Sequence, residues 1–478
     1  MKFLQDILFL FFILITALLL ASFKAEPLVW LSFFINGLLL FVILIYHIYY
    51  EKIYSPFLSN FIVFSYLFLW MAPIIQIGYF TDLTTAKFPN NFPYRLDLIL
   101  YANLLIFSFN LTFFIAYLFL KRKISPVSIK YPVIKKQILP ILIYSILFLS
   151  ILIFIFTFPV VLDEIIKPKW QEGTLSKMYT LIVNKSLLFI PFGGIILSKY
   201  YLKTTNKKTV NYYWVGLAMI LLLLLLLWFK NPLTEKRHAL GPIYITLIFL
   251  FYPKFLNSNL KMMSFMFITM IILFPLVAII THASVSLDEI LQNPAILLIQ
   301  SHDEGLLKVF HSLHYDAFSN ILATVDYVQQ NGLSWGYQLL GVFLFFIPRS
   351  IWILKPLGTG QMIGQYLMKT YHFNFDNLSN PLISEAYINF GFLGVILGAI
   401  VLAAIIKRFL NWLYGKHILK KYLAFYFAVY LMFLLRGDLL NATAYFIGIL
   451  IAVLFVPFII ERLLIFFYLT STKNNDKK

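Results

Sequence analysis

Long apolar runs alternate with shorter polar connections along almost the whole chain. A helix that crosses a membrane needs about 20 consecutive apolar residues. The runs are apolar on all sides, whereas the strands of a membrane barrel would show short alternating segments. The pattern therefore predicts an all-α polytopic membrane protein with about twelve transmembrane helices, at residues 3–23, 28–50, 57–80, 96–120, 138–162, 179–197, 211–229, 238–252, 262–282, 386–406, 422–435 and 439–460.

The connection at residues 283–385 is long enough to carry elements of its own. Ser301 and Glu304 have the spacing of a capping box and predict the start of a helix. An apolar face continues through Phe310 and Val325, and Asn331-Gly332 predicts the helix end. Residues 337–347 are apolar but rise only about 16 Å as a helix, roughly half the hydrocarbon thickness. We expect a re-entrant or interfacial half-helix there.

These segments divide the chain into nine spans at 1–282, a large loop at 283–385, three spans at 386–460 and a tail at 461–478. Only 12% of the residues are charged, against roughly 25% in soluble domains, so soluble and disordered classes are excluded. The chain has no cysteine, which excludes disulfides and thiolate metal sites. The first apolar run resembles a signal peptide, but no small-residue cleavage site follows it, and we expect a retained span.

The net charge of +18 is unevenly distributed between the two sets of connections. The set that includes both termini holds 23 Lys and Arg against 4 acids, and the other set holds 14 against 16. By the positive-inside rule the first set is cytoplasmic. Both termini are then expected in the cytoplasm, and the large loop on the outer, periplasmic side.

Cations near the outer ends of the spans are candidate binding residues, because charge at membrane depth is costly and usually functional. Arg237 and His238 fall in the first turn of a predicted helix, where cations oppose the helix dipole by about 0.3–1 kcal/mol each. A bound anion would explain them, and an arginine reaching lipid phosphate is the alternative. Arg349 and Lys355 lie in a loop stiffened by prolines, where an ordinary interfacial belt is the alternative. Arg436 ends a short span, and an ion pair with Asp438 is its favoured interpretation.

The outer acids and histidines suggest other chemistry. Glu385 opens the tenth span and is either a structural acid at a helix start or a general base. His311 and His314 have helical spacing, but no clear third metal ligand accompanies them, so a solvated helix face is favoured. Asp316 is placed to share a cavity with them. No credible nucleotide, nicotinamide or haem motif occurs.

Several stretches together resemble the Wzy-type oligosaccharide repeat-unit polymerases, which make bacterial O-antigens of lipopolysaccharide and related surface polysaccharides. Lys236–Gly241 is similar to an arginine-containing span start of that family, and Arg349 and Gly360 match an Arg-x10-Gly spacing. The resemblance covers about a third of the chain, residues 237–394, and Ile353 departs from a proline common after the Trp. The stretches that carry it are His314-Tyr315-Asp316-Ala317-Phe318-Ser319-Asn320, Gly341, Ile347-Pro348-Arg349-Ser350-Ile351-Trp352 with Lys355-Pro356, and Ser384-Glu385-Ala386-Tyr387-Ile388-Asn389-Phe390-Gly391-Phe392-Leu393-Gly394.

The resemblance implies a metal-independent, inverting glycosyltransferase of the bacterial inner membrane that needs no cofactor. It joins undecaprenyl-diphosphate-linked oligosaccharides at the periplasmic face, with a flippase and a chain-length regulator as partners, and binds no nucleic acid. The diphosphate would be bound by Arg237, Arg349, Lys355, Arg436 and His238, and the base would be Glu385, Asp316 or His314.

The alternatives are an O-antigen ligase-like glycosyltransferase, a flippase or other transporter of lipid-linked oligosaccharides, and a scaffold. The long outer loop and the lack of a visible internal repeat argue against a transporter.

Overall fold

The computed structural model describes residues 2–121, 138–166, 183–205, 209–232, 235, 237–273 and 309–475. Over these ranges the chain is helical, and the only strand-like pairing is one isolated bridge between Lys87 and Pro93. The α-helices are α1 (Lys2–Ser22), α2 (Pro27–Ile45), α3 (Pro56–Tyr66), α4 (Ala72–Gly78), α5 (Leu96–Lys121), α6 (Leu139–Ile166), α8 (Ile190–Thr204), α9 (Val210–Phe229), α10 (Arg237–Phe251), α11 (Asn259–Ile268), α16 (Ala317–Asn331), α17 (Tyr337–Phe343), α18 (Thr359–Tyr371), α19 (Leu382–Leu413), α20 (Ile418–Arg436), α21 (Leu439–Leu450) and α22 (Val456–Asn475).

Short π-helical segments continue or join several of these helices, at Tyr46–Tyr50, Leu67–Met71, Thr269–Leu273 and Ile451–Phe455. Within the described ranges, nine helices are long and apolar enough to cross a membrane, which confirms a multi-pass membrane protein. Two further predicted spans correspond to the shorter apolar helices His238–Phe251 and Asn259–Leu273. The remaining predicted span, 179–197, begins outside the described residues and continues as α8, which has 15 residues.

Local sequence explains where several helices begin. The Ser55 hydroxyl accepts a hydrogen bond from the Leu58 N–H, and Pro56 occupies the first turn of α3, where its missing N–H costs nothing. Asp438 caps α21 in the same way through the Asn441 N–H. Helix α19 is kinked at Gly391, whose φ of +61° suits glycine because it has no Cβ.

The predicted helix of the large loop is only partly correct. From Val309 to Tyr315 the chain forms two 3-10 turns, and α16 starts at Ala317, so no single helix runs through the predicted apolar face. Its end at Asn331 is confirmed, with Gly332 at φ +81°. The predicted start at Ser301 and Glu304 lies outside the described residues.

The predicted half-helix is shorter than expected, because α17 ends at Phe343 and turns follow it. Helix α18 was not predicted. It carries Gly360 and Gly364 at positions where an added Cβ would lie 2.1 Å from the Leu378 carbonyl oxygen and 2.3 Å from that of Asp376. The two glycines therefore let the segment before α19 pack directly on the α18 backbone.

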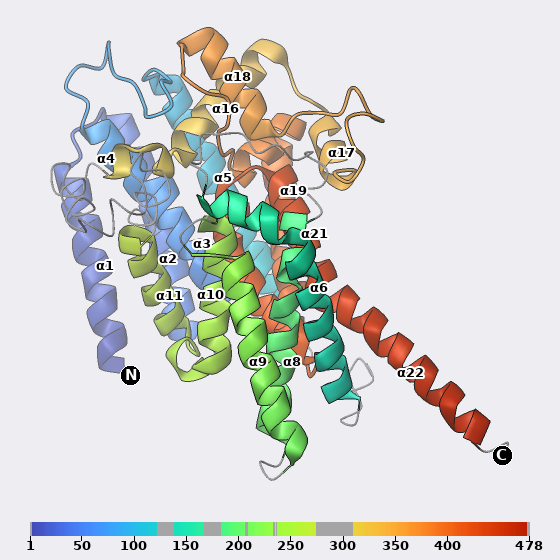
Figure 1. The fold of residues 1–478 in the computed structure, drawn as a ribbon. Coiled ribbons are helices and arrows are strands. Elements are labelled where there is room, and N and C mark those ends of the chain that lie inside the picture. The colour runs from blue at the N-terminus through green and yellow to red at the C-terminus, as the bar shows by residue number, and fades with distance from the viewer. Residues whose placement is uncertain are drawn as a thin grey trace.

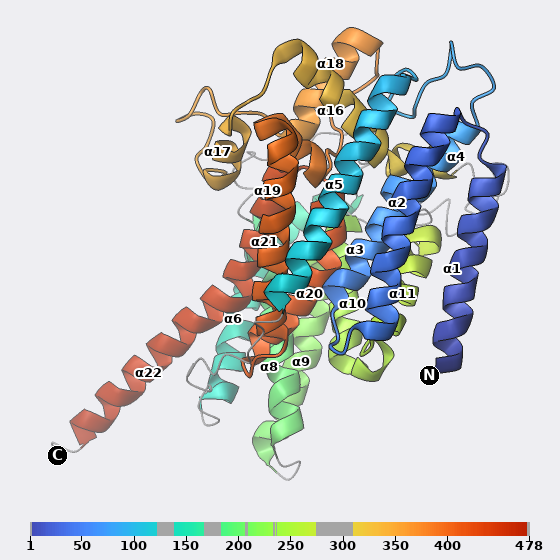
Figure 2. The same ribbon diagram turned by 180° about the vertical axis from the view of Figure 1, so that it is seen from behind.

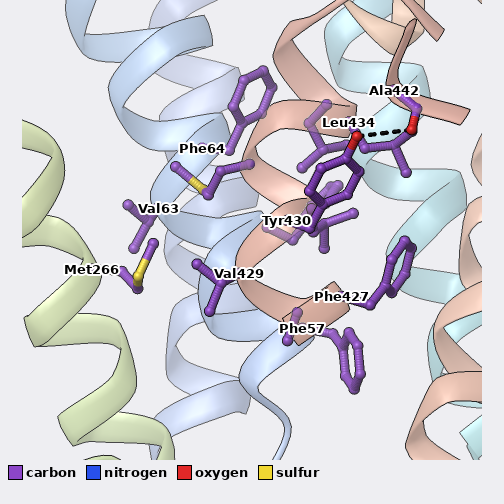
Figure 3. Packing of buried hydrophobic residues seen from close by; sticks show 14 of the residues in the cluster. Phe57, Val63, Phe64, Met266, Phe427, Val429, Tyr430, Leu434 and Ala442 are labelled. Atoms are coloured by element: carbon purple, nitrogen blue, oxygen red, sulfur yellow. Dashed lines mark hydrogen bonds between the residues drawn. The ribbon is translucent and has the colours of Figure 1, made fainter. Parts of the chain in front are cut away.

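One apolar core joins the spans. Figure 3 shows its centre, where Phe57 and Val63 of α3 face Phe427 and Val429 of α20, with Met266 of α11 on the other side. The Tyr430 hydroxyl donates a hydrogen bond of 2.8 Å to the Ala442 carbonyl and so ties α20 to α21.

The helices of the large loop collect at one end of the bundle. Figures 1 and 2 show α16, α17 and α18 at this end and both chain termini at the other. Helices α10, α19 and α21 begin at the end that carries α16–α18, and α20 finishes there. The candidate residues at these helix ends therefore lie at one end of the protein. This agrees with the prediction that all of them belong to the outer connections.

Candidate functional site

The candidate residues meet at the corner between α20 and α21, residues 436–439. Arg436 is the last residue of α20, and its Nη2 donates to the Leu313 carbonyl at 2.9 Å and to Asp316 Oδ1 at 3.2 Å. The Asp316 side chain is 2% exposed and that of Arg436 21%. The expected partner of Arg436 was Asp438. The ion pair that the structure shows is with Asp316, and Asp438 serves as the N-cap of α21.

Asp316 is a fully engaged carboxylate. Its Oδ2 accepts from Asn320 Nδ2 at 3.0 Å, and its Oδ1 accepts from Ser379 Oγ at 3.2 Å as well as from Arg436. Burial raises the pKa of the Asp316 carboxyl, against the opposing effects of Arg436 and of both hydrogen bonds. With both oxygens occupied, Asp316 is better suited to fixing the Arg436 guanidinium than to accepting a proton.

The turns before α16 present their backbone to this corner. Gln76 Nε2 donates to the carbonyl oxygens of Phe310 at 2.7 Å and Tyr315 at 3.0 Å, and so holds both 3-10 turns. His314 is half-buried in the second turn, next to the carbonyl that Arg436 binds. The His311 ring, in the first turn, packs on Tyr79 at 4.4 Å. The sequence predicted that the two histidines share one solvated helix face. The structure instead places them in two separate 3-10 turns.

Glu385 lies on the other side of the corner, in the first turn of α19, and is 1% exposed. Its Oε1 accepts from Thr359 Oγ1 at 2.5 Å and from the Leu439 N–H at 2.8 Å. Its Oε2 is buried and has no hydrogen-bonding partner among the described residues. A buried carboxylate oxygen without a donor is rare and marks Glu385 as a candidate for a functional role.

The start of α18 is fixed against the same corner. An added Cβ at Gly358 would lie 1.9 Å from Asp438 Oδ2, so the glycine backbone packs directly on that carboxylate. Thr359, the next residue, bonds Glu385. Asp438 is also the N-cap of α21, where an acid suits the helix dipole.

His238 approaches the corner from α10. Its ring stacks on Phe433, one turn before Arg436, with centroids 4.3 Å apart, and meets Tyr445 of α21 edge-on at 4.8 Å. Lys185 Nζ lies 4.3 Å from the centre of the same Tyr445 ring. Arg237 is the first residue of α10, and its side chain lies outside the described part of the structure.

Arg349 and Lys355 occupy the turns after α17. Arg349 donates from Nη1 to the Lys355 carbonyl at 2.5 Å and from Nη2 to the Pro356 carbonyl at 2.9 Å. Lys355 Nζ donates to the carbonyls of Phe345 at 2.7 Å and Ile347 at 2.8 Å. Burial, and then the nearby Arg349 charge, lower the pKa of the Lys355 ammonium. Both cations bind backbone of their own loop, which the sequence did not indicate.

Five of the eight candidate residues therefore lie at or beside the α20–α21 corner: Asp316, Arg436, His314, Glu385 and His238. Sequence reasoning missed Thr359, Ser379 and Gln76, which hold the site through hydrogen bonds to residues far along the chain. Of these three residues, only Gln76 could have been noticed in the sequence, because it is a polar residue inside an apolar run. Thr359 and Ser379 lie in the large loop, where polar residues are ordinary.

Comparison with known proteins adds no identification to this geometry. No protein-family model matches the chain, and no curated protein or solved structure matches it.

Proposed function

We propose that this chain is a membrane glycosyltransferase that joins undecaprenyl-diphosphate-linked oligosaccharides into a surface polysaccharide. The single observation that carries the proposal is the meeting of the Arg436–Asp316 ion pair with the buried Glu385 at one end of a multi-pass bundle. A fixed cation on one side of the α20–α21 corner and a buried carboxylate on the other are the groups that this transfer needs, for stabilisation of a leaving anion and acceptance of a proton.

In the proposed reaction, a hydroxyl of the acceptor oligosaccharide attacks the anomeric carbon of the donor. The bond from that carbon to the diphosphate oxygen breaks, and undecaprenyl diphosphate leaves with the electron pair. The hydroxyl proton passes to Glu385 Oε2, the oxygen without a hydrogen-bonding partner among the described residues. This oxygen is buried, so the acceptor hydroxyl would reach it only after the packing around Glu385 opens; Thr359, at the start of α18, binds the other oxygen, Oε1.

Arg436 would stabilise the charge that the diphosphate gains, and Asp316 would position its guanidinium. His238 and the cation Arg237 would complete the anion site from the first turn of α10. Arg349 and Lys355 retain N–H groups beyond those that bind their own loop, because a guanidinium has five and an ammonium three. They would therefore approach the diphosphate only from the loop surface.

The charge distribution between the connections supports an orientation for this chemistry. With both termini in the cytoplasm of a bacterial inner membrane, the α20–α21 corner faces the periplasm. Lipid-linked donors would enter it laterally between spans.

The test is elongation by the purified chain in lipid vesicles. Lipid-linked oligosaccharides extracted from cells lacking the chain are supplied as both donor and acceptor. We expect a ladder of longer glycans and one undecaprenyl diphosphate released per bond formed, with both lost in Arg436→Gln. Transfer of intact units to lipid A-core without a ladder would identify a ligase, and translocation without new bonds a flippase; either result refutes the polymerase.

A further inference from the structure

The turns after α17 expose an unusual amount of apolar surface. We call residues 343–354 the 343–354 loop. Five of its large apolar side chains are between 68% and 82% exposed: Phe343, Phe346, Ile351, Ile353 and Leu354. Scattered exposed apolar residues are normal, but a cluster of this kind in one short segment marks an interaction surface.

Much of the backbone of the 343–354 loop is hydrogen-bonded within the loop itself. Arg349 and Lys355 together bind four backbone carbonyls of residues 345–356. The Tyr337 hydroxyl donates to the Leu354 carbonyl, and the Ile351 and Trp352 N–H groups donate to Pro348 O at 3.0 Å. Irregular backbone exposed to lipid does not occur in the hydrocarbon core, so a loop with these internal bonds suits the interface, where headgroups and water reach its other polar groups.

The position of the loop is fixed by α17, which packs on α21. An added Cβ at Gly341 would lie 2.6 Å from Pro356 and 3.7 Å from Leu440. Leu440 is the second residue of the span Leu439–Phe467, so the loop departs near the level at which that span begins. Figures 1 and 2 both show α17 at the outer edge of the end that carries α16 and α18, with the following segment pointing outward from it.

We propose that the 343–354 loop inserts into the outer interface of the bilayer, where lipid acyl chains cover its apolar side chains. Arg349 and Lys355 are the internal partners of its carbonyls. Lipid is the occupant that fits, because the apolar tip is continuous with a membrane span through α17. The loop also carries Trp352 and the exposed cation Arg349, the residue types that favour headgroups. The inference needs only the membrane fold and goes beyond the proposed reaction.

The absence of cysteine from the sequence makes a direct test simple. Ile351→Cys and Ile353→Cys are labelled with an environment-sensitive fluorophore, and the full chain is placed in phosphatidylcholine and phosphatidylglycerol nanodiscs. Thr370→Cys on the exposed face of α18 is the aqueous control, and Ile400→Cys on α19 is the lipid control. We expect lipids brominated near the headgroup to quench both loop positions at least about twofold more than Thr370→Cys.

Three results would overturn the proposal. In the first, the two loop positions are quenched no more than Thr370→Cys and react with a charged aqueous thiol reagent as fast as Thr370→Cys does, which would place the loop in water. Quenching could require added undecaprenyl phosphate, which would assign the surface to a polyprenyl chain. Protection could depend on protein concentration, which would assign it to a second copy.

The role of the cations is tested separately in the Ile353→Cys background. Arg349→Gln leaves two carbonyls without their charged donor, and we expect quenching by brominated lipid to fall toward the Thr370→Cys level. Lys369→Gln, which removes an exposed cation from α18, is the matched control and should leave quenching unchanged. Equal quenching in Arg349→Gln and Lys369→Gln would refute the internal-partner role. Neither readout depends on glycosyl transfer, so this inference fails independently of the proposed function.

Discussion

Arg436 and Asp316 are 120 residues apart in the chain, and their side chains form an ion pair of 3.2 Å. The pair fastens the end of a membrane-embedded helix to the turn that starts α16. Asp316 is in turn bonded by Asn320 and Ser379, so the Arg436 guanidinium is held by a network and not by a single flexible partner. A cation fixed in this way loses little orientational freedom when an anion binds, which is the condition for effective charge stabilisation.

The first prediction concerns this pair. Arg436→Gln leaves the Asp316 carboxylate buried beside a neutral amide, and removing one partner of a buried pair costs about 3 kcal/mol. We expect a lower melting temperature in detergent and a fall in glycan elongation of about 100-fold or more.

A double-mutant comparison separates stability from chemistry. Asp316→Asn combined with Arg436→Gln should recover part of the melting temperature but none of the elongation. Recovery of elongation in the double variant would contradict a direct role of Arg436. Arg436→Lys keeps the charge but loses one of the two contacts, to Leu313 or Asp316, and is expected to be intermediate in both measurements.

The spans were predictable because lipid demands all-round apolar helices, and that demand is local in sequence. Helix α20 was predicted at 422–435 and extends over Ile418–Arg436, since lysines at its start do not interrupt the backbone. The kink at Gly391 was not predicted, because a single glycine in an apolar run does not by itself indicate a break.

The site was predictable in its residue types but not in its pairings. Charge near span ends indicated Arg436, Glu385 and His238. The choice of Asp316 over Asp438 as the partner of Arg436 depends on where the turns before α16 fold back, which no spacing reveals. Helix α18 escaped prediction because Gly360 and Gly364, typical of loops, here permit close backbone packing.

The second prediction tests the free oxygen of Glu385. In Glu385→Gln the amide oxygen still accepts from Thr359 and the Leu439 N–H, so the corner should keep its structure. Loss of the base should lower elongation by about 10²–10⁴-fold with little change in melting temperature. Asp376→Asn, at a half-buried acid in the segment that packs on α18, is the control and should elongate normally. Normal elongation in Glu385→Gln would remove Glu385 from the mechanism.

The third prediction tests the packing of α18. Gly364→Ala places a Cβ 2.3 Å from the Asp376 carbonyl oxygen, and such overpacking against backbone costs about 1–3 kcal/mol. Gly216→Ala in α9 meets nothing within 4 Å and should be neutral or stabilise by up to about 1 kcal/mol, because alanine favours helix. The melting temperature of Gly364→Ala should therefore fall below that of the wild type, and that of Gly216→Ala should equal or exceed it. Equal values would show that α18 is not packed as described.

The fourth prediction concerns pH and the Asp316 carboxyl, whose pKa burial raises above its ordinary value of about 3.9. Between these two pKa values the unfolded chain has released the proton while the folded protein retains it, so folded stability falls as pH rises through this window. Asp316→Asn lacks this effect. The melting temperature of the wild type minus that of the variant should therefore decrease as pH rises from about 4, and then level off.

Asp376 provides a control of opposite sign. Its carboxylate accepts hydrogen bonds from Gln361 and Gln365, which lower the pKa of Asp376. Its contribution to stability is then present above the ordinary pKa and is lost as pH falls through the lowered one. The wild-type melting temperature minus that of Asp376→Asn should increase with pH over the acidic range. The wild-type melting temperature minus that of Asp316→Asn could also increase with pH. The effect of Arg436 on the Asp316 pKa would then exceed that of burial, and the prediction would be wrong.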